Sequence, residues 1–277
     1  MDHFFVTLPS NSSEDVYGKQ PMSTFKTRLA KPLHLDVNDW EFGLAEIIYP
    51  HSWHNINEGE FSVQIQVTND KTGVIEWLTK ELSIPSVYYK NPAELVETLN
   101  NTIRENIPPG QVTNYVFDYN ELLRKFMVYV KSAGNCAVEF KKELSVVLGF
   151  GDKPVKIKNT KKASRNRRLV RHDRIVYDDE KVVPDYVVDL NRGLHTFFLY
   201  CDLAEAQLVG DANVPLLRTI GVKGKHGEVV SHSFDNIHYV PLNPSTFQDV
   251  HVHINDDSGQ QVAFQYGRVI VKLHFRK

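Results

Sequence analysis

Three stretches, Tyr200-Cys201-Asp202-Leu203, Val209-Gly210-Asp211 and Pro215-Leu216-Leu217-Arg218, decide how this 277-residue chain is interpreted. An apolar strand over residues 197–200 runs into a turn, and a second apolar strand restarts at Pro215, where a strand can begin without losing a needed N–H. No nucleophile, base or metal-binding cluster accompanies these residues in the sequence. The pattern therefore predicts two strands with an architectural role.

The strand signal recurs on both sides of this region. Residues 61–67 alternate apolar and polar side chains, which is typical of a strand with one face on a core. The turn residues 69–73 and the apolar return at 74–78 predict a hairpin. Further strands are expected at residues 112–119, 125–130, 250–254 and 269–275.

Helix signals are few. Asn91 is a good N-cap before Pro92, and Leu95, Leu99 and Ile103 form an apolar stripe, which together predict a helix ending before Pro108. A shorter helix is expected over residues 141–148. Many short strands with two isolated helices predict an all-β fold, a β-sandwich or jelly roll.

The composition and motifs of the chain favour neither nucleic-acid binding, membrane insertion nor enzymatic activity. The formal net charge of −2 gives no global attraction to nucleic acid or membrane, and no apolar stretch reaches the ~18 residues that span a bilayer. Two cysteines, Cys136 and Cys201, suggest a reduced, intracellular product. No catalytic motif is present, so we expect no enzymatic activity and no cofactor. An enzyme assembled from scattered residues stays an open alternative.

One segment departs from this balance. Residues 153–174 carry ten basic side chains against one acid, Asp173, and we expect an exposed loop because like charges cannot be buried unpaired. It could contact nucleic acid phosphates, contact an acidic neighbouring subunit, or be a solvated loop or nuclear-import address. The basic residues are Lys153, Lys156, Lys158, Lys161, Lys162, Arg165, Arg167, Arg168, Arg171 and Arg174.

Metal binding is not expected. His251 and His253 stand at i and i+2 and would share one face of a strand, but two ligands do not make a site. Residues 256–259 superficially resemble a calcium loop without its later bidentate Glu, so a hairpin turn is predicted there.

The chain resembles the minor capsid protein, or penton, of Polintons (Mavericks), which are large virus-like DNA transposons of eukaryotes. The Tyr200–Arg218 segment carries this resemblance together with short motifs in the same order along most of residues 1–150 and 194–277. These motifs are Leu8-Pro9-Ser10-Asn11-Ser12-Ser13, Phe25-Lys26-Thr27-Arg28-Leu29, Trp40-Glu41-Phe42-Gly43-Leu44-Ala45-Glu46-Ile47, Tyr49-Pro50-His51-Ser52-Trp53, Val146-Val147-Leu148-Gly149-Phe150 and Leu273-His274-Phe275-Arg276.

The resemblance implies a single jelly roll of two four-stranded antiparallel sheets. We therefore expect one jelly-roll domain over residues 21–277. The few apolar anchors after Leu8 predict an N-terminal arm at residues 1–20, and the charge of the basic segment predicts a mobile insertion at about 152–190. The resemblance also implies a homopentamer at the five-fold vertices of an icosahedral particle, beside a double jelly-roll major capsid protein. Assembly would take place inside the host cell, in nucleus or cytoplasm. The basic segment is the least family-like part of the chain, so packaged DNA is expected as its partner from its charge alone.

Two other functions remain as alternatives. One is a carbohydrate- or receptor-binding β-sandwich module, which an exposed tryptophan on a concave sheet face would favour. The other is a nucleic-acid-binding protein that acts through residues 153–174. For the vertex protein, exposed aromatic loops at Tyr49–Trp53 and Tyr239–Pro244 are candidate interfaces between copies, although the core is the commoner place for an aromatic side chain.

Overall fold

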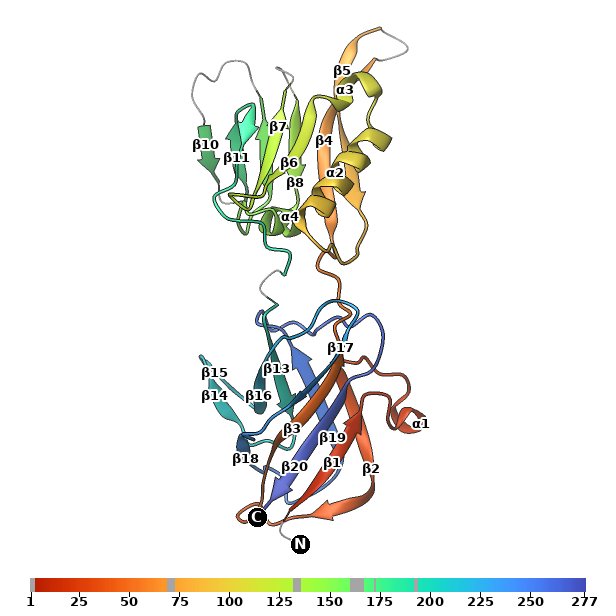
Figure 1. Cartoon of the computed structure of the whole chain (residues 1–277), viewed down its shortest axis with the longest axis vertical. Coiled ribbons are helices and arrows are strands. Elements are labelled where there is room, and N and C mark those ends of the chain that lie inside the picture. Colours follow the sequence, from red (N-terminus) through yellow and green to blue (C-terminus); the bar gives the residue numbers. More distant parts are fainter. Residues whose placement is uncertain (1–2, 69–72, 132–135, 160–166, 172, 192–193) are drawn as a thin grey trace. The chain divides into compact units, whose positions relative to one another are not determined.

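A computed structural model describes residues 3–68, 73–131, 136–159, 167–171, 173–191 and 194–277. The chain divides into two compact units, and each has its own hydrophobic core. Unit 1 comprises residues 1–53 and 193–277, and unit 2 comprises residues 54–192. Unit 2 is therefore inserted in the sequence between two segments of unit 1 (Figure 1).

Unit 1 is built on eight principal strands. They are β1 (His3–Pro9), β2 (Thr24–His34), β3 (Glu41–Pro50), β13 (Thr196–Cys201), β16 (Leu216–Gly221), β17 (Val229–Ser233), β19 (Thr246–Asn255) and β20 (Ile270–Arg276). One antiparallel sheet has the order β1-β20-β3-β17 and the other has the order β16-β13-β19-β2. In chain order these are strands one, eight, three and six, and strands five, four, seven and two, which is the order of a jelly roll.

Smaller elements complete unit 1. They are the helix α1 (Glu14–Tyr17), the hairpin of β14 (Gln207–Val209) and β15 (Ala212–Val214), and β18 (Tyr239–Pro241), which also pairs with β3. The all-β jelly-roll expectation is confirmed for unit 1, where β18 extends one of the two expected four-stranded sheets to five strands.

The core of unit 1 lies between its two sheets because side chains alternate along the strands. On β19, Val250, Val252 and Ile254 are buried, whereas His251 and His253 face outward. β20 alternates in the same way, with Val271, Leu273 and Phe275 fully buried. The strands predicted at residues 250–254 and 269–275 are therefore confirmed.

The expected N-terminal arm at residues 1–20 is wrong for residues 3–9. These residues form β1, which pairs with β20 from His3 opposite Arg276 to Pro9 opposite Ile270. The physical reason is alternation, since Leu8 is fully buried and Phe4 and Val6 pack against the same core.

Unit 2 also consists mainly of strands. A six-stranded sheet has the order β10-β11-β9-β8-β4-β5, in which only β11 and β9 are parallel, and a three-stranded sheet has the order β12-β7-β6. The strands are β4 (Gly59–Thr68), β5 (Ile75–Ile84), β6 (Tyr115–Asn120), β7 (Lys125–Val130), β8 (Ala137–Phe140), β9 (Val155–Lys158), β10 (Arg167–Val170), β11 (Ile175–Asp178) and β12 (Lys181–Val182). The helices are α2 (Pro92–Asn106), α3 (Pro109–Val112) and α4 (Lys142–Val147).

Two units stand where we expected one domain over residues 21–277. Unit 2 has a separate core that includes Phe61, Phe117, Phe126, Phe140 and Phe150. The basic insertion expected at about 152–190 is not a loop in its described part, because β9, β10, β11 and β12 belong to the sheets of unit 2. Val155, Ile157 and Ile175 anchor this region in the core.

The local predictions for unit 2 are confirmed in kind. β4 and β5 form the expected hairpin, as do β6 and β7, although β6 begins at Tyr115 and not at residue 112. α2 begins where the cap signal placed it, since the Asn91 side chain accepts a hydrogen bond from the Glu94 N–H at 2.9 Å. The shorter helix is α4, which ends just before Leu148.

Candidate functional site

The described basic residues of the 153–174 segment lie at one side of the six-stranded sheet of unit 2. Lys156 and Lys158 are on β9, Arg167 and Arg168 are on β10, and the remaining described members flank these strands. Lys161, Lys162 and Arg165 lie outside the described residues, and so does the side chain of Arg167. The described members therefore come from a folded surface rather than from a free loop.

Acidic side chains partner four of these basic residues. Lys156 and Arg174 both face Glu139, at 3.9 and 3.7 Å. Two further pairs join Lys158 to Asp178 at 3.7 Å and Arg168 to Asp185 at 2.5 Å. The positive charge that the sequence concentrates here is thus partly compensated by acids from β8, β11 and the segment after β12.

Lys153 and Arg171 differ from these four, because no ion pair involves either one in the described part of the chain. The Lys153 ammonium donates to the backbone carbonyl of Arg171 at 3.3 Å. Beside them, Arg174 holds the pKa of the Asp173 carboxyl below its ordinary value through a hydrogen bond. Lys153 and Arg171 are therefore the described cations best placed to meet an external anion.

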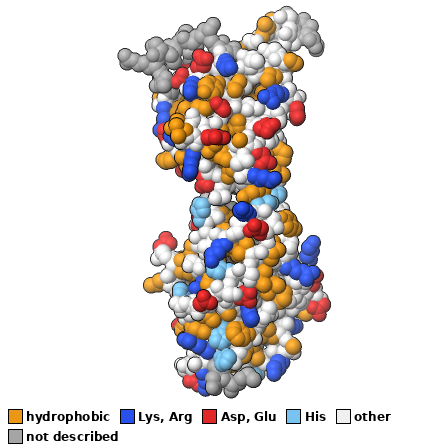
Figure 2. All heavy atoms as spheres, viewed as in Figure 1, with side chains coloured by type: hydrophobic (Ala, Val, Ile, Leu, Met, Phe, Trp, Pro, Cys, Tyr) orange, Lys and Arg blue, Asp and Glu red, His pale blue; other side chains and the backbone are white. Residues whose placement is uncertain are grey.

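Exposed aliphatic and aromatic side chains form a patch elsewhere on unit 2. Leu122 and Leu123, in the turn between β6 and β7, are 92% and 56% exposed, and Tyr186 and Val187 are 65% and 50% exposed. The two segments are adjacent, because the Val188 N–H donates to the Arg124 carbonyl at 3.0 Å. We call Leu122, Leu123, Tyr186 and Val187 the unit 2 apolar patch. Figure 2 shows in general that hydrophobic side chains lie among charged ones on the surface of this unit.

The sequence did not identify this patch. The turn between the strands was expected around Asn120-Glu121, and the two leucines that follow interrupt an otherwise polar turn. Adjacent leucines in a turn have no inward face to occupy, which was the available signal. Exposed apolar groups of this kind, when they cluster, mark interaction surfaces.

The aromatic loops proposed as interfaces between copies are mostly buried. Tyr49 is fully buried and Trp53 is 6% exposed, and both rings pack on Phe197 at 5.1 and 5.5 Å. In the second loop, Val240 and Leu242 are buried, and the Tyr239 hydroxyl bonds His274 Nδ1 at 2.7 Å. These aromatic side chains serve packing, so neither loop is an exposed aromatic surface.

The Tyr200–Arg218 region forms β13, the β14–β15 hairpin and β16. Gly210 has a φ of +61° at the tip of the hairpin, where glycine is favoured. Leu208 on this hairpin is 86% exposed, whereas Leu199 and Cys201 on β13 are fully buried. The expected turn at Val209-Gly210-Asp211 is thus the turn of a projecting hairpin.

His251 and His253 lie side by side on the outward face of β19, with ring centroids 3.8 Å apart. Burial, followed by the neighbouring His253 and Lys26, lowers the pKa of His251 to about 4. Burial also raises the pKa of Asp202, whose carboxylate accepts a hydrogen bond from the backbone N–H of His251 at 2.9 Å. No third ligand joins the pair, and the described residues contain no group of three or more His, Cys, Asp or Glu suited to a metal ion.

Two other features bear on function. Cys136 and Cys201 are both buried free thiols. Within the described ranges, no helix is long and apolar enough to cross a bilayer.

Comparison with known proteins gives structural matches only. No protein-family model matches the chain, and neither does any curated protein. The crystal structure of the mavirus penton protein is similar at 11% identity with a TM-score of 0.47, covering 100% of this chain and 99% of that one. A chain of the Sputnik virophage cryo-EM structure is similar at 11% identity with a TM-score of 0.44, covering 100% and 98%.

Proposed function

We propose that this chain is a structural minor capsid protein, a penton, of a Polinton-type element. The observation that carries the proposal is the strand order of unit 1. Its eight strands follow jelly-roll order, and the penton-like motifs lie on them, including Phe25–Leu29 on β2, Trp40–Ile47 at β3 and Leu273–Arg276 on β20. A fold alone does not assign function, so the motifs and the strand order support the proposal together.

In this function the protein works by shape and assembly. Five copies form a ring at each five-fold vertex of an icosahedral particle, next to a double jelly-roll major capsid protein. A ring uses a heterologous interface, in which one patch contacts a different patch of the next copy. An obligate interface of this kind buries more than about 2,000 Å². The particle is the site of action, after assembly inside the host cell.

The unit 2 apolar patch is our candidate for part of that interface. Exposure of its leucine side chains to water is unfavourable, and full burial of one leucine side chain contributes about 1.5–3 kcal/mol of stabilising free energy. Asp185 directly precedes Tyr186 in the chain and forms an exposed ion pair with Arg168, and a polar rim around an apolar centre is usual at interfaces between proteins.

The test is the mass of the purified protein, by light scattering after size exclusion, with negative-stain electron microscopy of the same fractions. We expect five times the mass of one chain and ring-shaped particles. Leu122→Asp combined with Leu123→Asp should shift the protein toward monomers. The matched control is Leu208→Asp, an equally exposed leucine on unit 1, which should leave rings intact. A wild type that stays monomeric at high concentration would contradict the penton proposal, whereas rings in both variants would contradict only the patch.

DNA contact through the basic segment is a separate part of the proposal. Four of its described cations already have acidic partners, so Lys153 and Arg171 are the described residues that we assign to phosphate contact. Replacing both with alanine should weaken binding to duplex DNA and reduce the slope of log affinity against log salt by about two. Binding that is absent at low salt, or unchanged in this variant, would contradict the assignment.

The carbohydrate- or receptor-binding alternative loses its main sequence support. Trp53 is buried, and Trp40 and Trp77 are partly buried against the cores of units 1 and 2. No tryptophan is therefore presented as an open stacking surface.

A further inference from the structure

The edge of a sheet in unit 1 is closed by side chains instead of by a strand. β2 is the last strand of the sheet β16-β13-β19-β2, and it pairs with β19 on one side only. In an antiparallel strand, alternate residues direct both their N–H and C=O groups to the same side. Lys26 and Arg28 direct theirs away from β19, which leaves four backbone groups for another partner.

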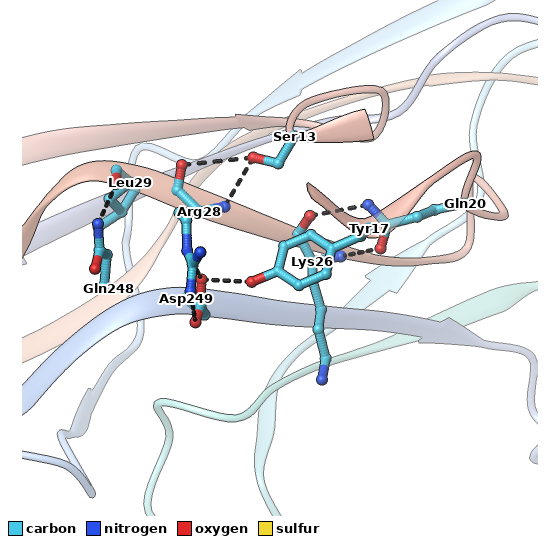
Figure 3. A network of polar contacts seen from close by, with 8 residues as sticks. All are labelled: Ser13, Tyr17, Gln20, Lys26, Arg28, Leu29, Gln248 and Asp249. Carbon is cyan, nitrogen blue, oxygen red and sulfur yellow. Dashed lines mark hydrogen bonds and ion pairs between the residues drawn. The ribbon is translucent and has the colours of Figure 1, made fainter. Parts of the chain in front are cut away.

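Two side chains from the preceding segment satisfy these groups (Figure 3). The Gln20 amide accepts the Lys26 N–H at 2.7 Å and donates to the Lys26 carbonyl at 2.9 Å. The Ser13 hydroxyl accepts the Arg28 N–H at 2.9 Å and donates to the Arg28 carbonyl at 3.5 Å. Each side chain therefore takes the place of one residue of an absent neighbouring strand.

The same arrangement occurs twice in unit 2. The Asn100 amide bonds both backbone groups of Phe117 on β6, at 2.8 and 3.1 Å. The Gln111 amide does the same for Gln66 on β4, at 2.7 and 2.8 Å. β6 is the last strand of its sheet, and Gln66 lies beyond the part of β4 that pairs with β8. Open strand positions in this chain are thus repeatedly closed by side-chain amides.

The segment over β2 is held more loosely than the others. Its ends are fixed, since Ser10 and Ser23 are buried and bond the backbones of Val269 and Ile254 at 2.8 and 2.7 Å. Between them, residues 11–22, which we call the cover segment, include α1, a helix with no buried residue. By contrast, Asn100 belongs to α2, which buries four apolar side chains in the core of unit 2.

Polar contacts provide most of the attachment of the cover segment. The Tyr17 hydroxyl donates to Asp249, whose carboxylate also pairs with Arg28 at 3.0 Å (Figure 3). Only Met22 of this segment packs against the core. The segment also borders a groove of about 680 Å³, which is lined by Ser10, Asn11, Glu14 and residues 19–23 and 261–268. Exposed ion pairs and hydrogen bonds of this kind contribute little individually, so the cover segment can detach at low cost.

We propose that the cover segment is a removable seal, and that the β2 edge beneath it binds an extended segment of a partner protein by strand addition. The partner segment alternates apolar and acidic side chains. On an added strand, one set of side chains would continue the inward face of Phe25 and Thr27, and the other would lie opposite Lys26 and Arg28. Opposite charges in such cross-strand positions are stabilising, and a second β2 edge would instead present like charges. This inference does not depend on the penton proposal.

The test compares wild type with Ser13→Ala combined with Gln20→Ala. Hydrogen exchange at single-residue resolution should show the Lys26 and Arg28 amides exchanging about tenfold faster in the variant, while those of Phe25 and Thr27 keep their protection. Gln260→Ala, at an exposed glutamine in the turn after β19, is the matched control and should change neither pair. Unchanged exchange at Lys26 and Arg28 would overturn the seal.

The binding arm uses two synthetic ten-residue peptides, one alternating valine with glutamate and the other valine with lysine. The glutamate peptide should bind the uncovered variant about tenfold more tightly than wild type, because it no longer competes with the two side chains. Adding Lys26→Glu should reverse the preference between the peptides. Equal binding of both peptides, or none, would overturn the acidic partner. Self-association of the uncovered variant without peptide would overturn it too, in favour of a second copy.

Discussion

Replacing Phe275 with alanine should lower the free energy of unfolding of unit 1 by about 3–5 kcal/mol. Phe275 is fully buried, and its ring centroid lies 4.9 Å from that of Phe4 and 5.3 Å from that of Phe42 in the same sheet. It also lies 6.0 Å from the ring of Phe247 on the facing sheet. A buried phenylalanine removes ~150–250 Å² from water, which at ~25 cal/mol per Å² gives an upper bound of about 4–6 kcal/mol.

Urea unfolding, followed by tryptophan fluorescence and far-UV circular dichroism, measures this loss. Trp40 and Trp53 belong to unit 1 and Trp77 to unit 2, so single-tryptophan versions separate the two transitions. The matched control is Phe5→Ala. Phe5 is on β1 beside Phe4 but is 51% exposed, and its loss should cost no more than about 1 kcal/mol.

Phe140→Ala provides the reciprocal test, because Phe140 is fully buried in the core of unit 2. It should destabilise unit 2 and leave the unit 1 transition in place. If Phe275→Ala and Phe5→Ala cost the same, the inward placement of Phe275 would be wrong. If either core variant shifted both transitions equally, the separation into two cores would be wrong.

Substitutions at three further positions test other parts of the structure. Asn91→Ala removes the cap of α2 and should cost about 1 kcal/mol in the unit 2 transition, whereas Asn91→Ser should retain most of it. Gly149→Ala should cost more than about 2 kcal/mol, because Gly149 has a φ of +88° and an added Cβ would lie 2.4 Å from the Tyr186 carbonyl; wild-type stability in this variant would refute the contact. The pKa of His251 is lowered to about 4 from an ordinary value of 6.5, so protonation of its ring favours unfolding. The free energy of unfolding is therefore unaffected by this group above pH 6.5 and decreases as the pH falls toward 4. The urea midpoint should fall over that window and fall less in His251→Gln; parallel profiles would contradict this reasoning.

Local patterns predicted local structure well in this chain. The Asn91 cap and the stripe at Leu95, Leu99 and Ile103 located α2, since capping and side-chain periodicity depend only on nearby residues. Alternation located β4 and β19 for the same reason. The jelly-roll class could be predicted because a chain of many strands and few helices has few ways to bury its apolar faces.

The division into two units could not be predicted from the sequence. Residues 51–55, His-Ser-Trp-His-Asn, cross from one unit to the other without the Pro, Gly or Ser enrichment that marks linkers. Both units consist mainly of strands, so periodicity does not change at the crossing. Which strand belongs to which core depends on pairings such as β1 with β20, between residues at opposite ends of the chain.

The candidate surfaces were predicted only in part. Counting charges located the basic segment, but its acidic partners Glu139, Asp178 and Asp185 lie outside or at the margin of the segment, and only folding brings them close. Tyr49 and Trp53 were predicted to lie in an exposed loop but are buried, because the sequence does not show which aromatic side chains face a core.

The insertion of residues 54–192 also determines the order in which the two units can fold during synthesis. All of unit 2 is contiguous, so it can complete its core while the ribosome is still translating the rest, and domains generally fold as units during synthesis. β3 emerges before unit 2, yet its partners β17, β18 and β20 are all encoded after it. β1 therefore has no partner until β20 is translated, whereas β2 must wait for β19 and β3 for β17.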